Sequence, residues 1–217
     1  MTENIEVLIH SSIRINGDKI IYADPFKIEG EPRNADMIFI THNHFDHFSV
    51  EDIERVRKED TVFVFPKAME GDIVALGISR ENMLAVTAGQ KICVGNIEAE
   101  AISAYNVGKP FHPKSDGWVG YIITVGGKRI YIAGDTDITE ENKRVECDIA
   151  LVPIGGKYTM NAAEAAELIN IIKPQTAIPV HYGSVVGDAG SAEMAEEFKE
   201  KVGSGTRVII KINSEGK

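Results

Sequence analysis

One short segment of the sequence concentrates residue types that can coordinate a metal ion. Residues 41–47 read Thr-His-Asn-His-Phe-Asp-His and directly follow the apolar run Met-Ile-Phe-Ile. His42 and His44 alternate by two, whereas Asp46 and His47 lie on the following turn and can point toward a second position. Imidazole nitrogens and carboxylate oxygens are ligands of zinc and related ions. Because half of the chain's six histidines fall here, we interpret the segment as a metal-binding loop rather than a surface loop.

Two later segments place the same residue types at strand ends. Asp135 follows a predicted strand at 128–133, and His181 follows a predicted strand at 176–180. In α/β proteins such strand ends meet in one crevice, where sites form. Taken singly, an aspartate after Ala-Gly is also common as a turn residue, and a lone histidine can be a buried side chain with satisfied hydrogen bonds. The residue types therefore favour one shared site and leave the individual roles open.

The elements that must position these residues are short strands alternating with a few helices. The first half predicts strands at 5–9, 12–16, 19–23, 36–41 and 61–65, and helices at 49–58 and 67–76. In the remainder of the chain the sequence predicts helices at 139–145, 162–172 and 191–201. The strands predicted there are 83–87, 91–94, 96–104, 118–125, 128–133, 148–152, 176–180 and 206–212. We find neither a linker nor a repeat. The prediction is one α/β domain over 1–217, with two mixed sheets and helices on their outer faces.

A long loop at 105–117 interrupts the strand pattern and contains two prolines. Long loops inside compact domains are often functional. Lys109 and Lys114 lie on this loop, and Lys157 lies on another loop that we expect at the border of the cleft. In an acidic chain they indicate a small anionic substrate, such as a phosphate ester or a carboxylate. The alternative is that they are ordinary exposed lysines.

The composition limits the partners and the compartment. The net charge is −10, with 33 acidic residues against 23 Lys and Arg, which disfavours general attraction to nucleic acid or to an anionic membrane. The N-terminal residues are acidic and polar, and the apolar runs are too short for a membrane span. Cys93 and Cys147 lie far apart without metal-type spacing. We predict free thiols in a cytoplasmic protein, with a single disulfide as the alternative.

Together these motifs resemble the metallo-β-lactamase superfamily. Residues 41–47 look like its T-H-x-H-x-D-H signature, Gly134-Asp135-Thr136 matches its G-D-T element, and 179–183 resembles its last histidine motif. The segment 154–160 is similar to the branch of UPF0173-type hydrolases and ascorbate-6-phosphate lactonase relatives. The resemblance extends from about residue 7 to 182. It implies a four-layer αββα sandwich with a one- or two-metal site in the cleft between the sheets.

The resemblance also implies the ligands. The first metal would be held by His42 and His44, and Asp135 would bridge both metals. The second metal would be held by three further residues, namely Asp46, His47 and His181. In the family, another histidine ends the strand before the long loop and completes the first set. Here that strand ends in Ala104-Tyr105-Asn106, without a histidine.

Three explanations for this difference remain. His112 could fold back from the loop, Asn106 or a water could take the position, or only one metal could bind tightly. We favour His112 near the metals, as a ligand or an acid/base group, over a substrate contact or an ordinary loop residue. His10 resembles the first-strand turn of the family, and we expect it beside the ligands or substrate. Asp24 resembles an early aspartate that steadies the ligand loop by hydrogen bonding.

The expected function is metal-dependent hydrolysis of an ester, lactone or phosphodiester by a metal-activated water. Asp46 and Asp135 would balance the metal charge and orient that water. The sequence has neither a G-x-S-x-G elbow nor a P-loop. Zinc is the first expectation, with Mn²⁺ or Fe²⁺ as alternatives. Two other functions remain open, a nucleic-acid phosphodiesterase and a non-catalytic metal- or ligand-binding protein. The protein could also form a homo-oligomer.

Overall fold

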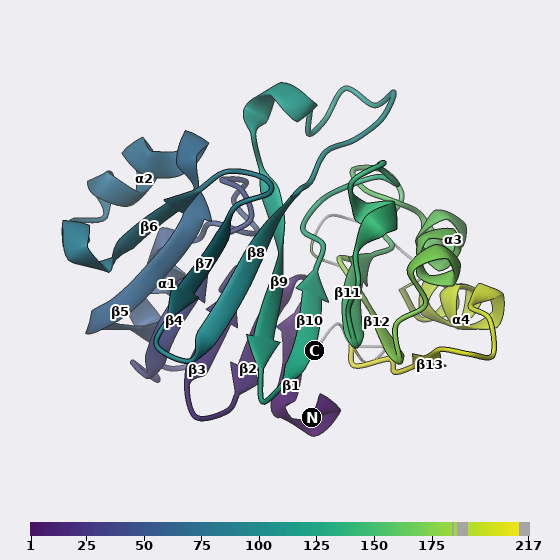
Figure 1. Ribbon diagram of the computed structural model, residues 1–217, viewed down its shortest axis with the longest axis horizontal. Coiled ribbons are helices and arrows are strands. Elements are labelled where there is room, and N and C mark those ends of the chain that lie inside the picture. Colours follow the sequence, from purple (N-terminus) through teal and green to yellow (C-terminus); the bar gives the residue numbers. More distant parts are fainter. Residues whose placement is uncertain (184, 186–190, 213–217) are drawn as a thin grey trace.

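The computed structural model describes residues 1–183, 185 and 191–212. Two β-sheets face each other, and helices cover the outer side of each sheet (Figure 1). This is the four-layer αββα sandwich, so the predicted fold class is confirmed. The predicted domain of 1–217 includes residues 213–217, which lie outside the described residues. The loop at 105–117 projects beyond the sheets at the top of Figure 1.

The first sheet has six strands in the order β1-β2-β3-β4-β5-β6. They are β1 (Ile5–Ile9), β2 (Ser12–Asn16), β3 (Ile20–Ala23), β4 (Ala35–Phe39), β5 (Arg57–Pro66) and β6 (Met83–Val86). Strands β1 to β3 are antiparallel, whereas β3 to β6 are parallel. Parallel neighbours need crossover connections. Helices α1 (Val50–Val56) and α2 (Glu70–Ala75) provide the last two crossovers.

The second sheet has seven strands in the order β13-β12-β11-β10-β9-β8-β7. They are β7 (Lys91–Val94), β8 (Ile97–Ser103), β9 (Val119–Val125), β10 (Lys128–Ile132), β11 (Ile149–Pro153), β12 (Thr176–Val180) and β13 (Arg207–Val208). Strands β7 to β10 are antiparallel and β10 to β13 are parallel. Helices α3 (Ala162–Ile172) and α4 (Ser191–Lys201) connect the last parallel strands. Five short 3-10 helices complete the described elements, namely η1 (Thr2–Asn4), η2 (Lys67–Met69), η3 (Arg80–Asn82), η4 (Lys114–Asp116) and η5 (Asn142–Arg144).

The apolar run before the histidine loop is continuous because both faces of β4 are buried. Met37 and Phe39 belong to the core between the sheets, whereas Ile38 and Ile40 belong to the core beneath α1 and α2. Side chains alternate along a strand, so a strand buried on both sides needs apolar residues at every position. The two cores therefore fix β4 from both faces, and β4 in turn fixes the position at which the loop 41–47 begins.

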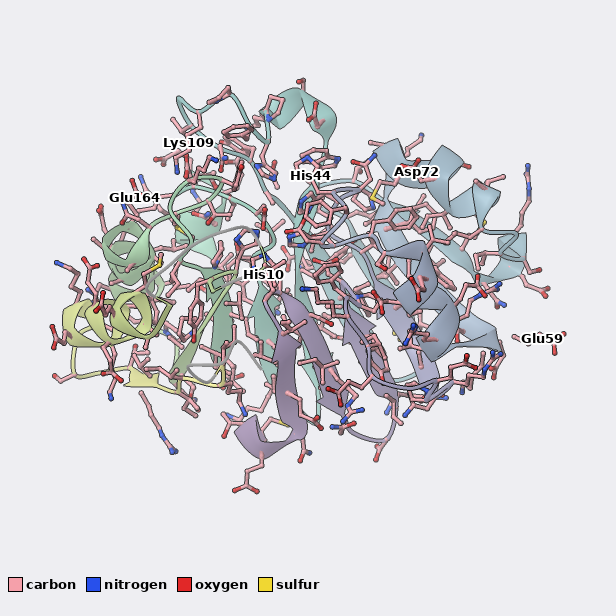
Figure 2. All side chains as sticks on the ribbon, turned by 180° about the vertical axis from the view of Figure 1, so that it is seen from behind. His10, His44, Glu59, Asp72, Lys109 and Glu164 are labelled. Atoms are coloured by element: carbon pink, nitrogen blue, oxygen red, sulfur yellow. The ribbon has the colours of Figure 1, made fainter. Side chains whose placement is uncertain are left out.

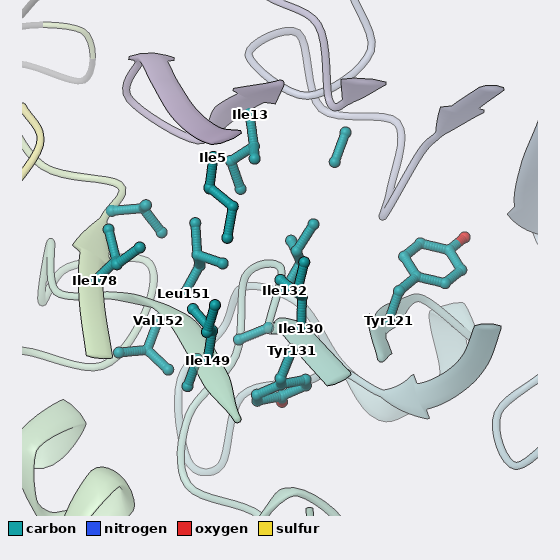
Figure 3. Close-up of a cluster of buried hydrophobic side chains, with 14 of the residues drawn as sticks. Ile5, Ile13, Tyr121, Ile130, Tyr131, Ile132, Ile149, Leu151, Val152 and Ile178 are labelled. Carbon is teal, nitrogen blue, oxygen red and sulfur yellow. The ribbon is translucent and has the colours of Figure 1, made fainter. Parts of the chain in front are cut away.

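The core between the sheets anchors the strand ends that carry the polar residues. In Figure 3, Ile5 and Ile13 of the first sheet point toward Leu151 and its neighbours in the second sheet. Burying one such side chain contributes about 1.5–3 kcal/mol. Tyr121 crosses the interface, and its hydroxyl donates a 2.7 Å hydrogen bond to the Ile40 carbonyl. This bond fixes the second sheet directly to the residue before the histidine loop.

Three predicted elements differ most from the observed ones in length or type. The helix predicted at 139–145 contains only η5, because the side chains of Thr139 and Asn142 accept hydrogen bonds from each other's backbone N–H and close a short turn. Strand 61–65 begins four residues earlier, at Arg57, since Arg57 already pairs with Ala35. The strand predicted at 206–212 forms only the short edge strand β13, which pairs with β12 through two residues.

Candidate metal centre

The polar residues of interest follow five different strands and meet at one edge of the two sheets. His10 follows β1, Asp24 follows β3, the loop 41–47 follows β4, Asp135 follows β10 and His181 follows β12. Together with His112, they bring all six histidines of the chain into two adjacent groups. Figure 2 shows His10 and His44 near the middle of the molecule, beneath the loop that carries Lys109.

Group one consists of His42, His44, His112 and Asp135, whose potential ligand atoms all lie within 4.8 Å of one another. The Nε2 atom of His112 lies 3.2 Å from Asp135 Oδ2, and that of His42 lies 3.8 Å from the same oxygen. The loop residue His112 thus occupies the place beside the first histidine pair. Of the three explanations for the missing strand-end histidine, the geometry matches the one in which His112 folds back.

Group two consists of His10, Asp46, His47 and His181, again with potential ligand atoms within 4.8 Å of one another. Asp46 Oδ2 lies 3.2 Å from Nε2 of His10 and 3.5 Å from Nε2 of both His47 and His181. Asp135 also contacts this group, at 3.2 Å from His47 and 3.0 Å from His181. Asp135 therefore lies between the two groups, in the position of a bridging carboxylate.

The unpartnered atoms of these residues test whether a metal ion would fit. Nε2 of His42, His47, His112 and His181 and Oδ1 of Asp135 are buried and have no hydrogen-bond partner among the described residues. Leaving such atoms unpaired costs about 1–3 kcal/mol each, so they require another partner. Imidazole nitrogens together with carboxylate oxygens are a donor set that zinc, manganese or iron accepts. The residues present fit a metal ion in each group.

Asp24 fixes the orientation of the histidine loop from behind. Its carboxylate accepts hydrogen bonds from the Thr41 N–H at 2.8 Å, from the Thr41 hydroxyl at 2.6 Å, and from His47 Nδ1 at 2.7 Å. With Nδ1 bonded to Asp24, Nε2 is the nitrogen of His47 that faces Asp46 and Asp135. Burial raises the pKa of the Asp24 carboxyl, although His47 and Thr41 oppose that effect.

Asn106 holds the loop residue His112 in place. The Asn106 N–H donates to the His112 carbonyl at 2.8 Å, and Asn106 Nδ2 lies 3.3 Å from His112 Nδ1. The same amide donates to the Tyr158 carbonyl at 2.7 Å. Asn106 therefore supports His112 from behind.

His10 lies closer to the centre than the sequence suggested, since its Nε2 is one of the atoms of group two. Its ring centroid lies 3.9 Å from that of His181, and its carbonyl accepts a 3.1 Å hydrogen bond from the His181 N–H. Burial, and then the nearby His181, lowers the pKa of His10 to about 4. His10 is therefore a neutral imidazole at pH 7, which is the form that binds a metal or accepts a proton.

Four of the site residues have left-handed backbones. The φ angles are 52° at His10, 46° at Asp24, 54° at His112 and 56° at His181. Non-glycine residues rarely adopt this conformation, which costs of order 1–3 kcal/mol per residue. His10, Asp24 and His181 each follow a strand, so at these positions the left-handed residue turns the chain sharply at the end of the strand. Packing elsewhere in the fold must maintain these turns.

The carboxylates of both groups stay ionised. Burial alone would raise the pKa of Asp135, but His181 and His47 outweigh it and hold that pKa well below its usual range. Asp46 behaves similarly, because the neighbouring His10, His181 and His47 outweigh its burial and lower its pKa. Two buried negative charges in a cluster of imidazoles form a site suited to cations.

The histidines themselves respond to these charges in opposite directions. Burial lowers the pKa of His42, and its histidine neighbours lower it further. Burial would also lower the pKa of His181, but Asp135 and Asp46 outweigh that effect and raise it to about 9. Group two, which has more carboxylate contacts, is therefore the more attractive of the two groups for a positive charge.

Each of the three lysines expected at the cleft contacts another residue of the chain. Lys109 forms an ion pair with Asp137 and donates to the Thr159 carbonyl. Lys114 forms a 2.6 Å ion pair with Glu141. The Nζ atom of Lys157 lies 4.8 Å from the centre of the Tyr158 ring. A role of these lysines in binding an anionic substrate stays a prediction.

A cavity of about 530 Å³ opens above the two groups. Its lining includes His44, His112 and Asp135 together with three aromatic residues that the sequence analysis did not select, namely Phe45, Phe111 and Tyr158. Trp118, the only tryptophan, was also not selected, although its ring lies 4.9–5.4 Å from His44, His42 and His112. Two of these aromatic residues, Phe45 and Phe111, adjoin a histidine in sequence, which could have identified them.

An αββα sandwich with paired histidine–aspartate groups where the sheets meet is the architecture of a metallo-hydrolase. Comparison with known proteins agrees with this class. Residues 4–181 match the sequence model of a family described as a Beta-lactamase superfamily domain. A UPF0173 protein from Pyrococcus abyssi is 34% identical over 177 residues, covering 80% of this chain and 79% of that protein.

Two further relatives extend over nearly the whole chain. A UPF0173 metal-dependent hydrolase from Thermococcus onnurineus is 32% identical and covers 95% of both chains. The solved structure of a protein from Parabacteroides distasonis, described as a metal-dependent hydrolase, superposes with a TM-score of 0.77 at 30% identity, over 95% of this chain and 91% of that one. The chain therefore belongs to the metallo-β-lactamase superfamily, in its UPF0173 branch of metal-dependent hydrolases. Over its described residues, none of its helices has the length and apolar character needed to cross a bilayer.

Proposed function

We propose that the protein is a hydrolase with two metal ions, one held by group one and one by group two, with Asp135 between them. The observation that carries the proposal is the set of buried, unpartnered donor atoms on His42, His47, His112, His181 and Asp135. Zinc is the first choice, with Mn²⁺ or Fe²⁺ as alternatives, because the donors are imidazoles and carboxylates. His10 and His44 complete the donor sets.

The metals, when bound, supply Lewis acidity that polarises a carbonyl or phosphoryl oxygen and activates water. The residues of the chain prepare the site for this chemistry. Asp46 and Asp135 remain ionised at neutral pH and partly neutralise the cations. Asp24 holds the proton of His47 on Nδ1, so that Nε2 faces the site. Since His112 Nε2 points at Asp135, a ligand role suits it better than an acid/base role.

The proposed substrate is a small molecule with an ester, lactone or phosphodiester bond. A nucleic-acid substrate is disfavoured by the net charge of −10. Both cysteines are free, which supports the proposed cytoplasmic location. The main argument for a non-catalytic binding protein was the missing histidine, and the position of His112 in group one weakens that argument. A homo-oligomer stays a prediction.

Metal analysis combined with chelation tests the proposal. Purified protein saturated with zinc should hold two ions per chain. Turnover of bis(p-nitrophenyl) phosphate or a simple lactone should stop on chelation and return with added metal. Asp135→Asn should lose metal from both groups, whereas Asp148→Asn, whose carboxylate pairs with Lys128, should keep it. Less than one bound ion per folded chain at saturating zinc would refute the proposal.

A further inference from the structure

Aromatic side chains gather where the cavity opens to solvent. Phe45 is 66% exposed and Phe111 is 37% exposed, and they are the two aromatic residues among the exposed large hydrophobic side chains of the described chain. Both line the 530 Å³ cavity together with Tyr158. They come from three different loops, at 41–47, 105–117 and 154–160. Exposed apolar surface beside a polar centre marks a binding surface rather than a core.

Contacts with neighbours hold these rings in fixed positions. Phe111 and Tyr158 form a T-shaped pair with centroids 4.8 Å apart, and Phe45 packs edge-on against the buried ring of Phe26 at 6.0 Å. Such pairs prefer defined geometries. These rings are therefore already ordered before a ligand enters the cavity. Their side chains lose little conformational freedom when the ligand binds.

The charged side chains that line the cavity belong to the metal groups, and Lys157 lies against the Tyr158 ring. Among the described residues that line it, none is a lysine or arginine, and the carboxylates of Asp46 and Asp135 lie at the metal groups. Lys109 and Lys114 are paired with Asp137 and Glu141. Beyond the metal groups, the wall thus offers mainly apolar and aromatic contacts.

We propose that the substrate carries an aromatic or other planar apolar group next to the bond that is hydrolysed. This group would stack among Phe45, Phe111 and Tyr158, while the reacting bond faces Asp135 and the histidines. The cavity volume lies in the range of small-molecule sites, about 300–1,000 Å³, so ring and reacting group fit together. The inference rests on the proposed function, because it assumes that the bond is hydrolysed at the metal groups.

A pair of metal-chelating probes tests the inference without turnover. Acetohydroxamate and 2-naphthohydroxamate carry the same chelating group and differ in the aromatic part. Calorimetric titration of the zinc-loaded protein should give at least tenfold tighter binding of 2-naphthohydroxamate. Phe45→Ala and Phe111→Ala should each reduce that ratio about twofold to tenfold, as expected for one aromatic contact.

Two further variants separate the aromatic contact from general apolarity. Phe111→Leu keeps an apolar side chain without a ring and should also reduce the ratio. Val107→Ala removes an exposed apolar side chain on the same loop but outside the cavity lining, so it should leave the ratio unchanged. Circular dichroism of each variant checks that it is folded.

The outcomes distinguish the two proposals. Tight binding of acetohydroxamate with no preference for the naphthyl probe would overturn the aromatic inference and leave the metal site intact. A naphthyl preference that the phenylalanine variants do not change would also overturn it. A folded protein that binds no zinc would refute the proposed function and the inference together.

Discussion

Removing the imidazole of His112 should selectively weaken group one. His112→Ala leaves this group with His42, His44 and Asp135, while group two keeps all its donors. Loss of a residue that only supports a ligand costs 10–100-fold in metal affinity. Since His112 Nε2 itself faces Asp135 at 3.2 Å, we expect a loss of at least ~100-fold, which is about 2.7 kcal/mol.

The single tryptophan provides the assay. Trp118 contacts three histidines of group one, with ring centroids 4.9–5.4 Å away, so its fluorescence should report metal binding there. Titration of metal-free wild type should change this fluorescence, and His112→Ala should shift the change to at least ~100-fold higher metal concentration. Total metal analysis should then give one tightly bound ion per chain instead of two.

A second variant controls for backbone effects. His112 has a φ of 54°, a conformation that asparagine tolerates better than alanine. His112→Asn should therefore lose the metal as His112→Ala does, but with smaller loss of stability. If both folded variants bind two ions with the wild-type titration midpoint, the role of His112 in group one is refuted.

Three other perturbations test the support of the site and the fold. Asp24→Asn should lower the metal affinity of group two about 10–100-fold, measured by competition with a chelator, because the amide has one accepting oxygen where the carboxylate uses two, so at least one hydrogen bond from His47 or Thr41 is lost; unchanged affinity would contradict this. Phe39→Ala should cost about 3–5 kcal/mol in denaturant unfolding, since the ring is fully buried against Tyr121. Hydrogen bonds from Lys114 and Tyr105 lower the pKa of Glu141 to about 2. The ionised Glu141 carboxylate therefore stabilises the folded protein fully above about pH 4.3, the pKa of a glutamate in the unfolded chain. This stabilisation is lost as the pH falls toward 2. Partial exposure keeps it below ~1 kcal/mol. Glu141→Gln should reduce the acid dependence of unfolding by that amount, and an unchanged dependence would refute the pairing.

The strands and helices were predicted most closely where a local turn or cap signal marks the end of an element. The first three strands and the helix at 162–172 were predicted closely, because Asn16-Gly17-Asp18 and the cap at Asn161 are local signals. Strand 206–212 was predicted too long. Beyond the Ile209 N–H, which donates to the Ala177 carbonyl of β12, its apolar run packs on the core without pairing as a strand. Local pattern does not distinguish these two ways of burying a side chain.

The candidate site was predictable for residues in short motifs and less so for residues brought in by the fold. The loop 41–47 stood out by its spacing, but the depth of His10 depends on a left-handed turn and on the hydrogen bond that its carbonyl accepts from the His181 N–H, neither of which has a sequence signal. The aromatic residues of the cavity, Phe45, Phe111 and Tyr158, were not predicted for the same reason. Phe111 reaches the cavity only because the 105–117 loop folds back.

The donors of each group come from widely separated parts of the chain, and this sets an order for metal capture. During synthesis the chain emerges from its N-terminus, and domains fold as their sequence becomes available. The histidine loop emerges early, yet group one gains its last donor at Asp135 and group two at His181. A nascent chain therefore cannot complete either group from the loop alone. Under the proposed function, high-affinity metal uptake therefore follows assembly of the second sheet, which delays the choice of metal until the geometry that selects it exists.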